Sequence, residues 1–228
     1  MLNQAAETRG FAFHERISLN RPLASYDLVR RFFGRSVRNN PMQFRWIERS
    51  EYLNAGCGPN IVPGFMNIDC YWRPGILCWD LTRALPFGDS SLKGIYSEHC
   101  LEHLTYEDAG KALREFRRVL SPGGHLRVVV PDVELYIDLY VRARSGEKVV
   151  LPCQEELQTK TPLFALNRIM RDHQHLYAYD FEAMRQLIEQ AGFHSVTRTT
   201  FGSGSDPKLL IDTPERACES LYVEALAG

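Results

Sequence analysis

The sequence predicts an α/β protein with a doubly wound, seven-stranded, mostly parallel sheet and helices on both faces. Short apolar segments of strand length alternate with helical segments whose apolar residues recur every three or four positions. A glycine turn, Gly56-Cys57-Gly58, directly follows the first of these strand segments. The segment 125–130 is apolar enough to be a strand buried on both faces, as the strands of a parallel sheet are.

The composition is that of an ordinary globular protein, with 228 residues, 44% hydrophobic and 24% charged. This length fits one domain with an elaboration. A formal net charge of −1 gives no global field that would attract nucleic acid or a membrane, so neither partner is expected. No apolar run approaches the roughly 20 residues of a membrane span, and residues 1–16 contain no apolar signal core. We therefore expect a cytoplasmic protein.

The cysteines are six in number, and none of them forms a C-x-x-C pair. A zinc ribbon is therefore not expected. We expect small buried thiols in a reducing compartment.

The N-terminal residues 1–41 are predicted to form an arm and a helix that contribute to the acceptor site or a lid. Residues 42–228 are predicted to form the main domain. The helix should begin near Pro22 and end at Gly34. Four arginines cluster near its end, at Arg30, Arg31, Arg35 and Arg38. They fit either an anion-binding lip or, as we favour, a solvated basic end that complements the helix dipole.

The first strand ends at Asn54-Ala55, and the glycine turn follows it. Gly56 and Gly58 allow a sharp turn and leave room for a ligand to lie against bare main chain. The second strand ends in Asp69. An acid at this position can accept hydrogen bonds from both hydroxyls of a ribose.

The connection between these two strands is expected to be a loop. Only 11 positions separate Gly58 from Asp69, and a parallel crossover with a helix usually needs about a dozen residues or more. Pro59 and Pro63 further discourage a helix. The helix N-terminus that usually lies under a nucleotide should therefore be missing.

The remaining elements follow from hydrophobic periodicity. Further strands are predicted near Cys78 and at 92–97, 125–130, 196–201 and 221–225. Helices are predicted at 106–120, 133–144 and 162–171, and another follows Asp180 as its N-cap. The stretch 145–179 is longer than a usual connection and is interpreted as a lid-like insertion above the carboxyl edge of the sheet.

Four stretches in this order resemble class I S-adenosylmethionine-dependent methyltransferases. They are Leu53 to Asn60, Asn67 to Asp69, Tyr96 to Leu104 and Leu120 to Asp132. The likeness is closest to a small bacterial branch with LNxGCGPN and YSxHxLEHL motifs. It implies the Rossmann-like methyltransferase fold with strand order 3-2-1-4-5-7-6, and S-adenosylmethionine as cofactor.

The resemblance also implies which residues bind the cofactor. These are Asn54, Ala55, Gly56, Cys57, Gly58, Asp69, Cys70, Asp80, Leu81, Ser97, Glu98 and His99. The chain departs from the family at Asn54, where an acid is usual, and at Asn60, where a third glycine is frequent. Asp80 and Leu81 would meet the adenine, but an aspartate here also fits a turn or helix cap.

Histidines are the candidates for chemistry on the acceptor. His173 and His175 follow an acid, and His99 stands at the tip of a predicted strand, so each is a candidate catalytic base. Lid packing and a polar wall are the competing interpretations. His103 in the LEHL motif is interpreted as structural. A metal is not expected, because His173 and His175 are two apart and no third ligand is obvious.

The function predicted from the resemblance is methyl transfer to a small-molecule acceptor, most simply O-methylation of a sugar or secondary metabolite. We expect a monomer or homodimer. One alternative is a non-catalytic, ligand-binding partner subunit with the same fold. An RNA methyltransferase is disfavoured by the near-neutral charge. A nicotinamide enzyme is disfavoured because Ile61 stands where a third glycine would be.

Overall fold

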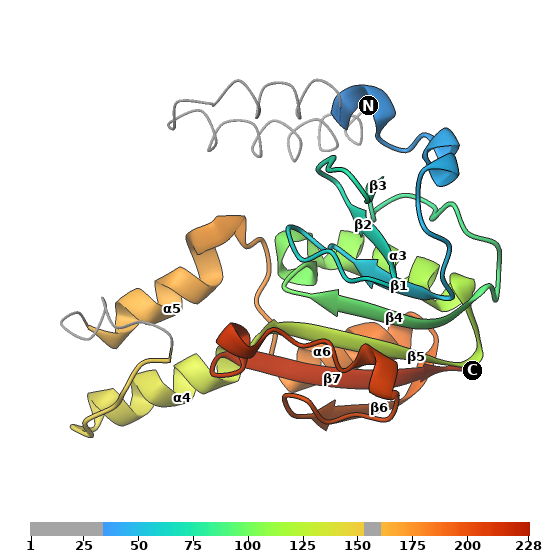
Figure 1. Cartoon of the computed structure of the whole chain (residues 1–228). Helices are drawn as coiled ribbons and strands as arrows, with labels where there is room; N and C mark the ends of the chain where they lie inside the picture. Colours follow the sequence, from blue (N-terminus) through green and yellow to red (C-terminus); the bar gives the residue numbers. More distant parts are fainter. Residues whose placement is uncertain (1–33, 153–160) are drawn as a thin grey trace, which may run out of the picture.

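The computed structural model describes residues 34–152 and 161–228, which form a seven-stranded sheet with helices. The strand order is β3-β2-β1-β4-β5-β7-β6 (Figure 1). β1 to β5 are parallel, and β7 runs antiparallel to both β5 and β6. The predicted α/β class, with a seven-stranded, mostly parallel sheet, and the predicted strand order are confirmed.

The strands lie close to their predicted positions. They are β1 (Tyr52–Ala55), β2 (Met66–Asp69), β3 (Leu77–Cys78), β4 (Leu92–Glu98), β5 (Leu120–Pro131), β6 (Phe193–Thr199) and β7 (Ser220–Ala227). β6 begins three residues before its predicted start, because Gly192 at φ 94° ends the preceding helix and the strand follows at once.

The helices also match the predicted segments. The α-helices among the described residues are α3 (Tyr106–Val119), α4 (Val133–Arg144), α5 (Pro162–Arg171) and α6 (Phe181–Gln190). The 3₁₀ helices are η2 (Pro41–Arg45), η3 (Leu101–His103), η5 (Asp172–Gln174), η6 (Pro207–Leu209) and η7 (Pro214–Arg216). Asp180 caps α6 as predicted, since its Oδ1 accepts from the Ala183 amide at 2.8 Å. Residues 34–37 are helical, so Gly34 does not end the first helix; its predicted start at Pro22 lies outside the described residues.

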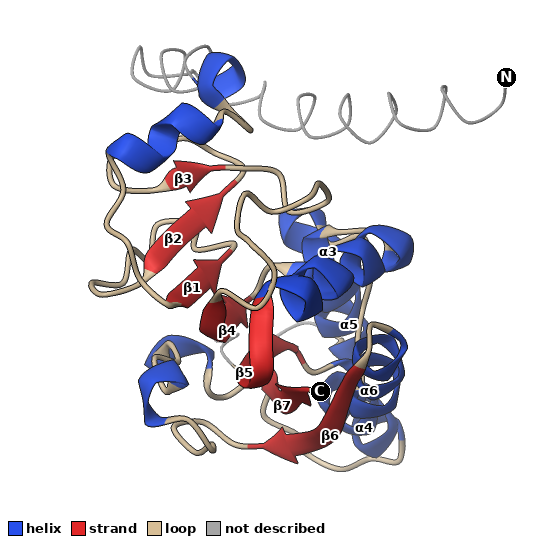
Figure 2. Ribbon diagram, turned by 90° about the vertical axis from the view of Figure 1, so that its right-hand side faces the viewer, coloured by secondary structure: helices blue, strands red, loops and turns tan. Residues whose placement is uncertain are grey.

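The two faces of the sheet are covered differently. α3 and α6 pack together on one face, above the main hydrophobic core (Figure 2). Side chains alternate along β4, so Ile95 joins that core while Tyr96 points to the other face. There Tyr96 packs with Leu209 of η6 and with Tyr222. In the described part of the chain, this second face is therefore covered by the segment 199–213, with its 3₁₀ helix η6, in place of the α-helix that the prediction of helices on both faces implied.

The β1–β2 connection is a loop, as predicted, and an amide pair stabilises it. Asn54 Nδ2 donates to the Asn60 carbonyl and to Asn67 Oδ1, each at 2.9 Å. Asn67 in turn accepts from the Val62 amide and donates to the Val62 and Phe65 carbonyls. Asn54 therefore satisfies backbone groups that a crossover helix would have satisfied itself. An acid at position 54 would lack these donors.

The α4–α5 pair lies beside the carboxyl ends of β4 and β5 (Figure 1). It has its own small hydrophobic cluster, which includes Tyr136, Leu139 and Ile169. After η5 the chain returns to the sheet, where the Leu176 amide donates to the Glu102 carbonyl at 2.7 Å. The segment that carries His175 is thus attached directly to η3. The predicted boundaries 1–41, 42–228 and 145–179 stay predictions.

The cysteines differ in part from the expected set of buried thiols. Cys57 and Cys78 are buried and free, whereas Cys70 is free but exposed. Cys218 is disulfide-bonded, so the expectation of a free thiol is wrong there. Among the described residues, none of the helices has the length and apolarity needed to cross a membrane.

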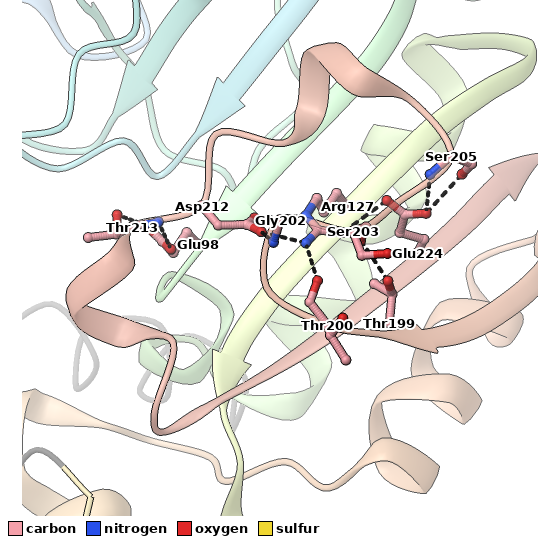
Figure 3. Close-up of polar contacts among 10 residues, drawn as sticks. All are labelled: Glu98, Arg127, Thr199, Thr200, Gly202, Ser203, Ser205, Asp212, Thr213 and Glu224. Atoms are coloured by element: carbon pink, nitrogen blue, oxygen red, sulfur yellow. Dashed lines mark hydrogen bonds and ion pairs between the residues drawn. The ribbon is translucent and has the colours of Figure 1, made fainter.

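A buried ion-pair cluster attaches the segment 199–213 to the sheet (Figure 3). Arg127 of β5 has 0% side-chain exposure and forms a bidentate pair with Asp212, with Nε–Oδ1 and Nη2–Oδ2 distances of 2.8 and 2.6 Å. Its Nη1 also donates to Glu224 Oε1 at 2.9 Å. The carbonyls of Ser203 and Thr200 take its two remaining N–H groups. All the donors of the guanidinium are therefore used.

Replacing Arg127 should strongly destabilise the fold. Arg127→Met keeps most of the side-chain volume but leaves the carboxylates of Asp212 and Glu224 buried without their cation, which should cost about 3–5 kcal/mol of unfolding free energy. Urea denaturation measures this change. Arg185→Met, in exposed ion pairs with Glu182 and Glu189, is the matched control and should cost less than about 1 kcal/mol. Equal costs for the two variants would contradict the assignment.

Candidate active site

The glycine turn and Asp69 are brought together at the carboxyl edge of the sheet. Asp69 Oδ2 accepts a hydrogen bond from the Gly58 amide at 2.9 Å, and Oδ1 accepts from the Tyr71 amide at 2.8 Å. The carboxylate thus faces the turn, as the ribose interpretation requires. Each oxygen keeps a second lone pair with which a hydroxyl donor can pair.

The two glycines of the turn serve different purposes. Both have positive φ, 72° at Gly56 and 52° at Gly58. A side chain on Gly58 would have no heavy atom within 4 Å, so the main chain is bare there. A Cβ on Gly56 would lie 2.2 Å from Cys100 Sγ. Cys100 therefore fills the space that a Cβ on Gly56 would need, while Gly56 itself lines a small pocket.

The other residues expected at the cofactor have varied surroundings. Ala55 and Cys57 are buried, and burial raises the pKa of the Cys57 thiol to about 12, so it is a neutral thiol. Asp80 Oδ1 accepts from the amide and hydroxyl of Thr82 at 3.0 and 2.7 Å. This is the local turn that the alternative interpretation of Asp80 described. Leu81 packs into the main core, and Cys70 is exposed beside Asp69.

The tip of β4 separates two hollows. Ser97 is 1% exposed, so its hydroxyl lies inside the fold. Glu98 lines a pocket of about 30 Å³ together with Asn54 and Gly56. Its carboxylate accepts hydrogen bonds from the amide of Thr213, at 3.0 Å, and from the Thr213 hydroxyl. Glu98 is therefore engaged by a neighbouring segment, which sequence reasoning did not anticipate.

A cavity of about 380 Å³ lies on the other side of the β4 tip. Its wall holds four histidines, which are His99, His103, His173 and His175. Arg168, Arg216 and Glu219 also line it. The structure thus gathers all three predicted catalytic histidines around one cavity, although they come from β4–η3 and from η5, about 70 positions later in the chain.

The histidines differ in their electrostatics. His99 Nε2 lies 2.8 Å from the Ser220 hydroxyl, and burial, with Arg216 nearby, lowers the pKa of His99 to about 2. His175 is buried as well, and burial lowers its pKa. Its Nδ1 lies 2.7 Å from the Ile169 carbonyl oxygen, so this nitrogen carries the proton and donates it. His173 is exposed and sits at φ 56°.

Glu102 is the residue that sequence reasoning missed. It is 1% exposed, and burial raises its pKa to about 8. Its Oε1 lies 3.5 Å from His99 Nδ1, 3.9 Å from His103 Nε2 and 4.0 Å from His175 Nε2. A charged residue directly after the apolar Leu101 in LEHL was a signal for it. Only the fold shows that His175 faces the same carboxylate.

Comparison with known proteins finds a family match for part of the chain. Residues 53–128 match the family model described as a methyltransferase domain, which confirms the predicted resemblance at the level of the domain. None of the curated protein sequences matches this chain.

Solved structures with a similar fold include three S-adenosylmethionine-dependent methyltransferases. The Archaeoglobus fulgidus protein is 14% identical, with a TM-score of 0.48, over 86% of this chain and 94% of that one. The Thermotoga maritima protein is 18% identical, with a TM-score of 0.46, over 88% and 92%. The Mesorhizobium loti protein is 16% identical, with a TM-score of 0.46, over 77% and 90%.

The contact between Gly56 and Cys100 predicts a difference between the two glycines. Alanine at either position must adopt positive φ, which should cost about 1 kcal/mol. Gly56→Ala adds a clash with Cys100 and should cost about 1–3 kcal/mol more than Gly58→Ala. Thermal or urea unfolding of both variants measures this difference.

Combining Gly56→Ala with Cys100→Gly provides the control. The second change removes both atoms of Cys100 that would lie within 3 Å of the new methyl group. The loss of unfolding free energy caused by Cys100→Gly alone must be subtracted first. If the effects of Gly56→Ala and Cys100→Gly on the unfolding free energy simply add, Cys100 is not the reason why Gly56→Ala costs more than Gly58→Ala.

Proposed function

We propose that this chain, whose residues 53–128 match a methyltransferase domain, transfers a methyl group from S-adenosylmethionine to a small-molecule acceptor. One observation carries the proposal. The Asp69 carboxylate lies 2.9 Å from the amide of Gly58, at the edge of a parallel sheet, beside main chain that no side chain covers. This is the arrangement that a ribose diol needs.

The residues at this edge fit the nucleoside end of the cofactor. Asp69 would accept the ribose hydroxyls, and Gly58 would let the ligand approach the backbone. The surface beside Cys70 and Asp80 would face the base. The pocket that Glu98 and Asn54 line is only about 30 Å³, far below the roughly 300 Å³ of a typical ligand site. Full binding of the methionine end therefore requires Thr213 to move away from Glu98. When bound, the sulfonium supplies the methyl group and a good leaving group.

The cavity behind His99 is the proposed acceptor site. Its volume of about 380 Å³ lies in the range of small-molecule sites, about 300–1,000 Å³, and is far too small for a folded RNA. Two arginines in its wall, and the imidazoles of His99 and His175, whose pKa values burial lowers, suit an acceptor with hydroxyl or acidic groups. O-methylation of a sugar or secondary metabolite is the reaction we favour, in a cytoplasmic monomer or homodimer.

His99 and His173 differ in how well they suit the role of a catalytic base. A general base works best when its pKa lies near the working pH. Burial holds the pKa of His99 near 2 and its ring is bonded to Ser220, so His99 is better suited to shaping the wall than to removing a proton. His173, exposed at the cavity mouth, becomes the preferred base candidate. Methyl transfer to an acidic acceptor would need positioning and exclusion of water more than a base.

The competing function is a ligand-binding subunit without catalytic activity. The engagement of Glu98 by Thr213 favours it, because the pocket beside Glu98 is then too small for the reacting end of the cofactor. The two functions differ in turnover. The purified protein should release S-adenosylhomocysteine from S-adenosylmethionine with at least one member of a panel of hydroxylated sugars and phenols. Binding without release for the whole panel would favour the subunit.

Loss of the Asp69 charge should weaken cofactor binding. Asp69→Asn removes a charge-assisted acceptor for the ribose and should cost about 1–3 kcal/mol of S-adenosylhomocysteine binding free energy. Isothermal titration calorimetry measures it. Asp138→Asn on the outer surface of α4 is the control and should bind as the unchanged chain does. Because Asp69 also accepts from two amides, the thermal stability of the variant must be measured beside its affinity. An unchanged affinity in a folded variant removes Asp69 from the site.

A further inference from the structure

The buried carboxyl group of Glu102 lacks hydrogen-bond partners within residues 34–152 and 161–228. Glu102 is 1% exposed, and neither of its carboxylate oxygens has a hydrogen-bond partner among the described residues. A carboxylate in this position is costly unless it is hydrogen-bonded, paired with a cation or bound to a metal. Arg216 and Arg168 line the cavity nearby, but no ion pair joins either of them to Glu102 within the part of the chain described.

The nearest groups to Glu102 are imidazole nitrogens. His99 Nδ1 lies nearest, 3.5 Å from Oε1, and His103 Nε2 and His175 Nε2 lie 3.9 and 4.0 Å from the same oxygen. One ligand atom each from Glu102, His103 and His175 all lie within 4.8 Å of one another. These separations are too long for hydrogen bonds. In a tetrahedral zinc site with bonds of about 2.0–2.1 Å, ligand atoms lie roughly 3.3 Å apart, so the most widely separated pair would have to approach by up to about 1.5 Å to close the set.

The tautomer of His175 matches a metal ligand. Its Nδ1 donates to the Ile169 carbonyl at 2.7 Å, so in the neutral ring Nε2 is unprotonated and presents a lone pair toward Glu102. A backbone carbonyl that accepts from the distal ring nitrogen is the usual outer partner of a metal-bound histidine. The hydrogen bond to Ile169 also fixes the orientation of the His175 ring, because it ties the segment after η5 to α5.

The backbone around the cluster is strained. His99, His173 and Gln174 all have φ between 46° and 68°, a region that residues other than glycine seldom adopt. Strain of this kind persists only where the surroundings enforce it, and it gathers at functional sites. Here it lies on both chain segments that bring imidazoles to the cavity.

We propose that Glu102, His103 and His175 bind a divalent transition-metal ion of the zinc class at the wall of the 380 Å³ cavity. Two imidazoles and one carboxylate favour zinc or a similar ion over magnesium or calcium, which prefer oxygen ligands. Three protein ligands leave a coordination position open, as in catalytic zinc sites. The sequence argument against a metal considered His173 and His175 as the ligand pair, whereas the proposed set joins His175 to His103 and Glu102.

The ion would give the cavity a specific chemistry. A hydroxyl that takes the open position loses its proton more readily than it does in water. This consequence rests on the proposed methyl transfer to an oxygen, but metal binding itself does not. Zinc binding is measured without cofactor or acceptor, so the metal site and the methyl transfer are tested independently.

Zinc titration of the purified, chelator-treated full chain tests the site. We expect one zinc ion per chain by calorimetry and by metal analysis after gel filtration. Glu102→Gln and His175→Ala should each lower the zinc affinity at least roughly tenfold. His194→Ala, an exposed histidine on β6, is the matched control and should leave the affinity unchanged. Circular dichroism of each metal-free variant checks that it folds.

Cobalt substitution distinguishes metal binding at this site from metal binding at cysteine thiolates. Cobalt bound to imidazole and carboxylate should give visible d–d absorption without the intense near-ultraviolet band of a cobalt–thiolate bond. This measurement uses the unchanged chain, so it remains decisive if a variant does not fold. The proposal is overturned if the chain binds no zinc, if a thiolate band is seen, or if folded Glu102→Gln and His175→Ala bind zinc as the unchanged chain does.

Discussion

The buried ion pairs of Arg127 with Asp212 and Glu224 hold the segment that covers the second face of the sheet beside the candidate site. They lie inside the second face of the sheet, where both carboxylates converge on one guanidinium. Desolvating three charges is compensated only because every N–H of Arg127 has an acceptor. The segment 199–213 is thereby held in one position, and it covers a face that has no α-helix in the described part of the chain. Thr213, next to Asp212, then reaches Glu98.

The short β1–β2 connection is likewise stabilised by polar side chains. Without a helix, the loop after Gly58 must satisfy its backbone groups through side chains, and the Asn54–Asn67 pair does so. The position where the family usually carries an acid is therefore occupied by a donor with a structural task. The ligand-facing charge that remains at this edge is Asp69, which is also held by two amides. Polar side chains here stabilise the fold and shape the site at once.

The carboxyl edge of the sheet explains why distant histidines meet. Parallel strands end at the same edge, so the residues after β4 and the segment that leads into α6 lie side by side. The Leu176 and Tyr177 amides donate to the Glu102 carbonyl, and this contact sets His175 against η3. The resulting cavity is lined by acids, arginines and imidazoles, and the side chains of Glu102 and His175 are buried there. Such an environment shifts pKa values strongly, as His99 and Glu102 illustrate in opposite directions.

The sequence by itself determined the fold class, the strand order through its family motifs, and nearly every helix boundary, because periodicity and capping are local properties. It also placed Asp69 at the glycine turn and predicted a loop in place of a helix between them. It did not predict that Cys100 fills the space that a Cβ on Gly56 would need, that Thr213 engages Glu98, or that Arg127 has two buried partners. Those contacts join residues up to 115 positions apart, and no local pattern encodes them. Glu102 shows the same limit, because its three imidazole neighbours come together only when the sheet edge brings η3 and η5 to one cavity.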